Sequence, residues 1–331
     1  MKSPYTGKDM KLKKEIRTVS FRKQEIEYTN LNYFCEESKE IFVTTELDEL
    51  NLKIIQNKYR EMNSIPFPEE IIKLRKKYGL SAAKMGELFG FGPNQYALYE
   101  SGEIPSLSNS KSISLALIPT IFKTMIVDSH GVLKDKDYKA ILHKINNEIL
   151  DGFDSSIQNY LLGDHDPDAF TGYKSPDYDK LANMVVYFAQ HLKPQKTVLN
   201  KLLFYSDFGH YKNHASSITG CRYAAIARGP VPDKFRSLFE KMENDFFIDI
   251  KYVEYPNGMV GEKFLTNENC TFKNDLFNAT EMNMMEKVKN CFKGKTTKDV
   301  VDISHEESAW LDNQENKSLI DYNYAFDLNM F

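Results

Sequence analysis

The stretch from Ile65 to Ser106 restricts the fold of this chain more than any other, because glycines divide it into short helical pieces. Pro68 opens the first piece, since proline is tolerated in a first helical turn, and the acids that follow it suit the positive end of the helix dipole. Gly79 ends this helix and Ser81 can cap the next one. A tight glycine turn then leads into a third helix, which Gly102 closes. This part of the chain is therefore predicted to be a small helical unit.

The second and third helices, with the glycine turn between them, have the pattern of a helix-turn-helix. The third helix is expected to begin at Pro93 or Asn94, and the first residues of such a helix meet base edges in the major groove of DNA. The amides of Asn94 and Gln95 could each bond N6 and N7 of an adenine, which is worth roughly 1–3 kcal/mol of discrimination. The residues predicted to contact DNA are Ser81, Lys84, Asn94, Gln95, Leu98 and Lys111.

Packing and charge leave a second interpretation of this unit open. Tyr96 and Tyr99 are three residues apart and are expected to pack inward against Ala82 and Met85, whereas Leu98 points outward toward a thymine methyl or a protein. The stretch carries five basic and five acidic residues, so it lacks the basic surface typical of a strong DNA-binding domain. A plain packing module is therefore the alternative to DNA binding.

The run LSAAKMGELFGFGPNQYALYESGE resembles the helix-turn-helix of MqsA-type antitoxins, which have a glycine-rich turn, an Asn at the start of the reading helix and Y-E-x-G at its end. The resemblance covers about forty residues and implies binding to operator DNA. That family usually has a DNA-contacting Arg where this chain has Leu98, so the resemblance does not imply the same operator sequence.

The N-terminal segment is predicted to be a β-ribbon. Short β-prone runs at 16–21, 26–28 and 41–45 alternate with turn-like pieces. The layout resembles the zinc ribbon that precedes the helix-turn-helix in MqsA-type proteins. The positions that correspond to its ligands hold three hydroxyls and one thiol, which cannot replace four thiolates on Zn²⁺. We expect a ribbon that kept its strands and lost its metal; the residues at those positions are Ser3, Thr6, Cys35 and Ser38.

The composition is that of an ordinary folded protein. The chain has 331 residues, a net charge of −4 and 41% hydrophobic residues. This length predicts two or three domains, and the hydrophobic content is enough to form their cores. The four cysteines are far apart and form no C-x-x-C pair, which favours reduced thiols in the cytoplasm. The chain shows neither a signal-peptide pattern nor an apolar run long enough to span a membrane. We predict a cytoplasmic protein that needs no cofactor.

Helical patterns continue on both sides of the central unit. Residues 46–60 form a connecting helix, 106–127 a helix or a pair broken at Pro119, and 135–150 and 155–162 two more. The loop that contains Asp164-His165-Asp166 could suggest a metal site, but a solvated linker is the preferred interpretation. The predicted division is 1–60 for the ribbon and its helix, 61–127 for the DNA-binding domain, 128–170 for a helical linker and 171–331 for a C-terminal domain.

The C-terminal half mixes helices with short strands. We predict helices at 177–191, 194–211, 231–242, 281–292 and from Thr297, capped by Thr296 or Thr297, with residues 304–310 ending that last helix. Strands are expected at 221–226, 246–254 and 262–265, with a turn at 228–232 and a hairpin turn at Pro256-Asn257-Gly258.

The ordered motifs K-L-L-x-Y-x-D, Thr-Gly, Y-x-A-x-x-x-G-P-V-P and a late His with Trp five positions on resemble the Panacea, or SocA-like, domain. The resemblance covers about 150 residues. It implies an antitoxin that neutralises a toxin encoded by the adjacent gene, whereas a SocA-type relative delivers its toxin to a protease. The residues assigned to toxin binding are Tyr205, Asp207, His210, Arg228 and Trp310.

Catalysis is the remaining alternative for this half. A lysine, a tyrosine, an aspartate, an arginine and several histidines could gather in a cleft and supply acid–base chemistry. The chain has no nucleophile elbow, P-loop or dinucleotide fingerprint, however, and His210 and His214 lack the glutamate of a H-E-x-x-H zinc motif. We therefore predict that the protein is not an enzyme and holds no metal. The residues considered for catalysis are Lys201, Tyr205, Asp207, His210, His214, Arg228 and His305.

The combined prediction is a mainly α protein with small β elements: a degenerate β-ribbon, a central helix-turn-helix bundle and a mixed, mostly helical Panacea-like domain with a short β-sheet. As a type II antitoxin it would silence a protein toxin with its C-terminal domain and, as a homodimeric transcriptional repressor, bind operator DNA with its helix-turn-helix. The alternatives are a proteolysis adaptor that delivers the toxin to a protease, and a one-component regulator without a toxin.

Overall fold

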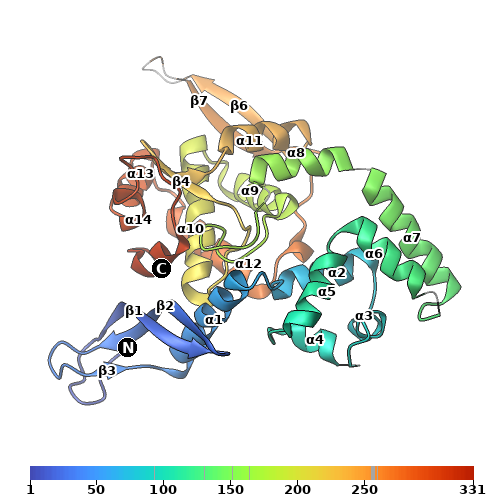
Figure 1. The fold of residues 1–331 in the computed structure, drawn as a ribbon. Helices are drawn as coiled ribbons and strands as arrows, with labels where there is room; N and C mark the ends of the chain where they lie inside the picture. Colours follow the sequence, from blue (N-terminus) through green and yellow to red (C-terminus); the bar gives the residue numbers. More distant parts are fainter. Residues whose placement is uncertain (93, 130, 151, 164, 255–257, 259) are drawn as a thin grey trace. The chain divides into compact units, whose positions relative to one another are not determined.

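A computed structural model describes residues 1–331 apart from 93, 130, 151, 164, 255–257 and 259 (Figure 1). The predicted helix start at Pro93, the Asp164 position and the Pro256-Asn257 turn lie outside the described residues. The fold is mainly helical with small antiparallel sheets, as predicted. The chain forms two compact units. One unit comprises 1–18, 27–54 and 160–331, and the other comprises 19–26 and 55–159.

The second unit contains the helices predicted around the glycine turn. Gly79, with a φ of 71°, ends the first of them, and Ser81 caps the next by accepting a hydrogen bond from the N–H of Lys84. The helices are α2 (Pro68–Tyr78), α3 (Ala82–Leu88), α4 (Gln95–Glu100), α5 (Leu107–Ala116), α6 (Pro119–Asp128) and α7 (Asp135–Leu150), with α8 (Gly152–Leu162) at the unit's C-terminal end.

Two tyrosines of α4 hold this unit together. Tyr96 is fully buried and donates to the carbonyl of Ile71 in α2 at 2.9 Å. Tyr99 is also buried, in the same apolar cluster as Met85 of α3. The predicted inward packing of both rings is therefore confirmed. The ion pair of Arg75 with Glu100 fastens the end of α4 to α2 at 2.5 Å.

The N-terminal ribbon is a three-stranded sheet in the order β1 (Lys11–Phe21), β2 (Gln24–Phe34), β3 (Ile41–Phe42). Helix α1 (Thr45–Met62) follows it. The side chain of Asn51 in α1 accepts from the N–H of Leu31 at 2.8 Å and donates to its carbonyl at 2.9 Å. One amide thus ties β2 to the connecting helix, and the predicted strands and helix are both confirmed.

Helix α10 is the centre of the C-terminal half, because every residue from Leu199 to Tyr211 is buried. The other elements are α9 (Tyr178–Leu192), β4 (Tyr223–Ile226), β5 (Gly229–Pro232), α11 (Phe235–Asn244), β6 (Ile248–Glu254), β7 (Val260–Thr266), α12 (Ala279–Phe292), α13 (Thr297–His305) and α14 (Ser308–Leu311), with short 3-10 turns at Asn274–Leu276 and Tyr322–Asp327.

Three predictions for this half were wrong. The segment Gly229–Pro232 is a strand that pairs with β4, not a turn, and the following helix begins at Phe235 rather than Val231. Proline is compatible with an edge strand, because such a position needs no inward N–H donor. Residues 304–310 do not end one helix: α13 stops at His305 and a separate α14 begins at Ser308.

Within the described ranges, no single helix is both long and apolar enough to cross a membrane; α5 and α6 meet such a criterion only as a pair bent by 106°. The four-part division into 1–60, 61–127, 128–170 and 171–331 stays a prediction.

Candidate functional site

Asp207 organises the K-L-L-x-Y-x-D motif in α10. Its side chain is fully buried and accepts four hydrogen bonds, from the N–H groups of Ile218 and Thr219 at 2.8 Å each, from the Thr219 hydroxyl at 2.6 Å and from the Tyr223 hydroxyl at 2.7 Å. Burial raises the pKa of Asp207, although these hydrogen bonds oppose the shift. The carboxyl therefore holds the Thr-Gly turn and the first residue of β4 against the central helix.

Lys201 fixes the G-P-V-P segment in the same way. Its ammonium is buried and donates to the carbonyl of Pro230 at 2.9 Å, and burial lowers the pKa of Lys201 to about 7. Gly229 has a φ of 92°, and a Cβ there would lie 2.6 Å from both Lys201 Cε and Ser304 Oγ. Only glycine fits at this position, which explains why the motif places Gly before Pro.

The late His and Trp of the pattern lock the C-terminal helices. The indole of Trp310 donates to the carbonyl of Ile226 at 2.8 Å, and its ring stacks on His305 at 3.8 Å. The hydroxyl of Tyr205 donates to the buried Glu307 at 3.1 Å, and burial raises the pKa of Glu307. These contacts join α10, β4 and α14 into one core.

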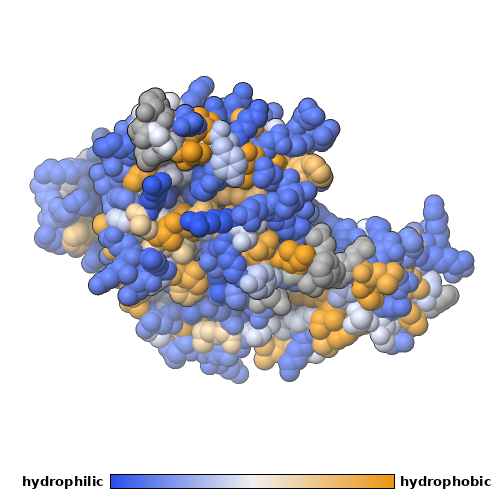
Figure 2. Space-filling model, turned by 90° about the horizontal axis from the view of Figure 1, so that it is seen from above, coloured by the Kyte–Doolittle hydropathy of each residue, from blue (hydrophilic) through white to orange (hydrophobic). Residues whose placement is uncertain are grey.

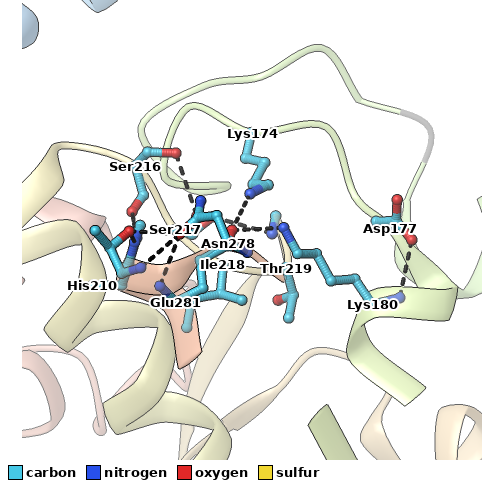
Figure 3. Close-up of polar contacts among 12 residues, drawn as sticks. Lys174, Asp177, Lys180, His210, Ser216, Ser217, Ile218, Thr219, Asn278 and Glu281 are labelled. Atoms are coloured by element: carbon cyan, nitrogen blue, oxygen red, sulfur yellow. Dashed lines mark hydrogen bonds and ion pairs between the residues drawn. The ribbon is translucent and has the colours of Figure 1, made fainter. Parts of the chain in front are cut away.

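His210 is also engaged inside the fold. Its Nδ1 lies 2.6 Å from the carbonyl of Ser216 (Figure 3), and its Nε2 lies 3.0 Å from the Thr280 hydroxyl. Burial lowers the pKa of His210 to about 4, so the ring is neutral at pH 7. The ring of His214 is 4.5 Å away. Nevertheless, the described residues contain no cluster of three or more His, Cys, Asp or Glu that could hold a metal ion.

A buried ion cluster beside His210 was not predicted. Figure 3 shows Lys174 and Lys180 directed at Glu281, with nitrogen–oxygen distances of 2.9 and 2.6 Å. Burial tends to raise the pKa of Glu281, but the two ammonium groups outweigh burial and the pKa is lowered. Glu281 also accepts from the N–H of Asn278, which caps α12. The N-x-x-E spacing of that capping box could have predicted the start of α12 from the sequence.

The five residues assigned to toxin binding therefore differ in accessibility. Tyr205, Asp207, His210 and Trp310 are at most 8% exposed and each has a partner inside the fold. Arg228 is exposed in the turn between β4 and β5. Of the five, only Arg228 could contact a partner directly, because the other four side chains are buried.

The residues assigned to DNA contact lie mostly at the surface of α3, α4 and α5. Leu98 is 44% exposed, and Asn94, Ser81 and Lys111 are exposed as well. Gln95 is half-buried and donates to Glu103 at 3.0 Å.

Lys84 is already engaged in α3: its ammonium is 2.6 Å from Glu87 and 3.1 Å from the carbonyl of Val132. A phosphate would have to compete with these two oxygens for Lys84, whereas Lys111 is exposed in α5.

The four positions that correspond to zinc ligands converge in the ribbon. Thr6 Oγ1 lies 3.5 Å from the sulfur of Cys35, and Ser3 and Cys35 are both buried. Hydrogen bonding to Ser38, then to Thr6 and Ser3, lowers the pKa of Cys35 to about 6. One thiol among three hydroxyls does not suit Zn²⁺, which prefers thiolate and imidazole ligands in structural sites.

Comparison with known protein families finds a match for part of the C-terminal half. Residues 199–311 match the family model described as antitoxin SocA-like, Panacea domain, which spans α10 to α14. No curated protein and no solved structure matches the chain. Residues 199–311 are thus similar to the SocA-like antitoxin domain, and this similarity suggests a role related to toxin–antitoxin systems. The resemblance of the helix-turn-helix stretch to MqsA-type antitoxins stays a prediction.

Proposed function

We propose that this protein is a cytoplasmic antitoxin that binds a protein toxin encoded by the adjacent gene and silences it through its C-terminal half. The observation that carries the proposal is the match of residues 199–311 to the SocA-like antitoxin domain. The buried polar side chains of that segment, such as Asp207 and Tyr205, are hydrogen-bonded to other residues of the same chain. Such an interior suits a binding module better than a catalytic cleft, in which polar groups face a substrate.

The second part of the proposal is repression of its own operon by the helix-turn-helix stretch. Support comes from the helices α3 and α4, from the tight turn between them, where Gly90 has a φ of 68°, and from the exposed side chains of Asn94 and Leu98. A six-residue reading helix gives few contacts, so we propose binding as a homodimer on a two-fold operator. The exposed apolar side chains of Leu115 and Ile118 in this unit would suit a contact between two copies.

Two tests separate this function from its alternatives. The half-life of the toxin in cells with and without this chain distinguishes silencing from delivery to a protease: a steady toxin level with lost toxicity supports silencing, and a shortened half-life supports the adaptor. A one-component regulator is favoured if no adjacent gene product is toxic alone and harmless together with this chain.

A further inference from the structure

The β6–β7 hairpin has one covered edge and one open edge. It extends away from α9 and α11 in Figure 1. The N–H of Phe264 in β7 donates to the carbonyl of Pro194 at 2.9 Å, and Gln195 bridges Lys263 in antiparallel fashion. The outer edge of β7 is therefore paired at Lys263 and Phe264. On β6, the N–H of Ile250 donates to the side chain of Glu243 at 3.0 Å, which covers only the start of that edge.

The register shows which backbone groups remain on the open edge. Ile250 is opposite Phe264, and the N–H groups of these two residues point away from each other. They form a non-hydrogen-bonded pair, so the alternation of an antiparallel ladder turns the N–H and C=O of Tyr252 outward and those of Lys251 and Val253 inward. Among the described residues, none accepts from the N–H of Tyr252. This strand thus offers a free pairing position at Tyr252.

Charge on the hairpin indicates what would pair there. Lys251 is directly opposite Lys263, and like charges in this position destabilise a strand pair. Neither lysine has an acidic partner among the described residues. On β1, by contrast, Lys13 and Arg17 share Glu15, and Lys11 is paired with Glu36. An acidic group supplied from outside would resolve the repulsion between Lys251 and Lys263.

The hairpin has few exposed apolar side chains that could anchor a partner. The side chain of Tyr252 is 73% exposed and lies on the face opposite to that of Lys251. On the face of the molecule that Figure 2 shows, hydrophobic residues form separate small patches among hydrophilic ones. Backbone pairing with a few side-chain anchors suits such a surface, because main-chain hydrogen bonds supply affinity and alternate side chains supply specificity.

We propose that β6 accepts an extended segment of the toxin as an added strand, centred on Tyr252. The segment would alternate acidic residues, which face Lys251 and Lys263, with apolar residues, which face Tyr252. This inference rests on the proposed function, since it takes the toxin as the partner. It assigns recognition to the hairpin, which contains none of the five residues assigned to toxin binding from the sequence.

The direct test is hydrogen exchange at single-residue resolution on the full chain, alone and with the purified product of the adjacent gene. The amide of Tyr252 is expected to exchange at least tenfold more slowly in the complex, whereas those of Lys251 and Val253, already in the ladder, change little. Binding without protection at Tyr252 would overturn the strand addition but leave the antitoxin function intact. Absence of any binding would contradict the proposed function itself.

A pair of proline variants provides the matched control. Tyr252→Pro removes the outward N–H on the open edge. Val260→Pro places the same kind of substitution at the nearby end of β7, the opposite strand. We expect Tyr252→Pro to raise the Kd for the toxin at least tenfold and Val260→Pro to leave it within twofold. If both variants bind like the wild type, the open edge is not used. The double variant Lys251→Glu with Lys263→Glu tests the same claim without altering the backbone, and unchanged affinity would exclude an acidic segment.

Discussion

The helix-turn-helix stretch and the C-terminal half use their sequence motifs in opposite ways. In the first, residues proposed to contact DNA, such as Asn94 and Leu98, lie at the surface, and buried tyrosines of the same helix region hold them there. In the second, the motif residues Tyr205 and Asp207 are the core, and the surface residues around them belong to no motif. A motif can therefore mark either a contact surface or the framework that positions one. Substitutions in the second region should act mainly on stability, and those in the first mainly on binding.

The largest effect is expected for Asp207→Ala. The substitution leaves the N–H groups of Ile218 and Thr219 and the Tyr223 hydroxyl without their buried acceptor, which should lower the free energy of unfolding by about 4 kcal/mol. Trp310 is the only tryptophan of the chain and is buried in this half, so its fluorescence during urea unfolding measures the loss. A loss of unfolding free energy below about 1 kcal/mol would contradict the comparison, because Asp207 would then contribute little to the stability of this half.

The next effect concerns pH. The pKa of His210 is lowered from 6.5 to about 4 in the folded protein. Between these two pH values, His210 is therefore protonated in the unfolded chain but neutral in the folded one. The free energy of unfolding should fall by about 1.4 kcal/mol per pH unit as the pH drops from 6.5 toward 4, or about 3 kcal/mol in all. The measurement is Trp310 fluorescence in urea over this range.

His210→Gln serves as the reference for that pH series. The difference in slope between the two proteins isolates the imidazole, because the carboxyl groups titrate in both. Equal slopes would show that the ring of His210 protonates in the folded state.

A smaller effect is expected from Asn94→Ala combined with Gln95→Ala. Loss of the proposed amide contacts with bases should weaken binding to the promoter of the operon by about 2 kcal/mol, enough to abolish retention in a gel shift. Protection against the toxin should be unaffected, since both side chains are distant in sequence from residues 199–311, which match the SocA-like family model. Retained repression would show that the reading helix is assigned wrongly.

The smallest effect is expected for Arg228→Ala. Because this side chain is exposed in the β4–β5 turn, its removal should change the free energy of unfolding by less than about 0.5 kcal/mol. Affinity for the toxin, measured by calorimetry, should fall by about 1 kcal/mol if Arg228 lies at the edge of the interface. A loss of stability with unchanged affinity would reverse the roles that the comparison gives to surface and core.

Sequence patterns predicted this fold where local signals are strong. The helix from Asp135 to Leu150 has the predicted bounds, and α6 begins at Pro119, where the break was expected. The strand at Gly229–Pro232 was missed because two prolines in four residues are typical of a turn, and its pairing depends on contact with β4.

The candidate sites were less predictable than the fold. Lys174 and Glu281 are 107 residues apart, and no local pattern indicates that they meet. Similarly, the open edge of β6 follows from which side of β7 is covered by Pro194, a tertiary contact. Local periodicity locates elements, but burial of a motif and exposure of an edge depend on the packing of distant segments.

The central claim is that the C-terminal half silences a toxin. It is tested most directly by the growth of cells that express the adjacent gene from an inducible promoter, with and without this chain, while the amount of toxin is measured. We expect full growth at an undiminished toxin level when this chain is present. Arrest of growth despite a folded and abundant chain would contradict it.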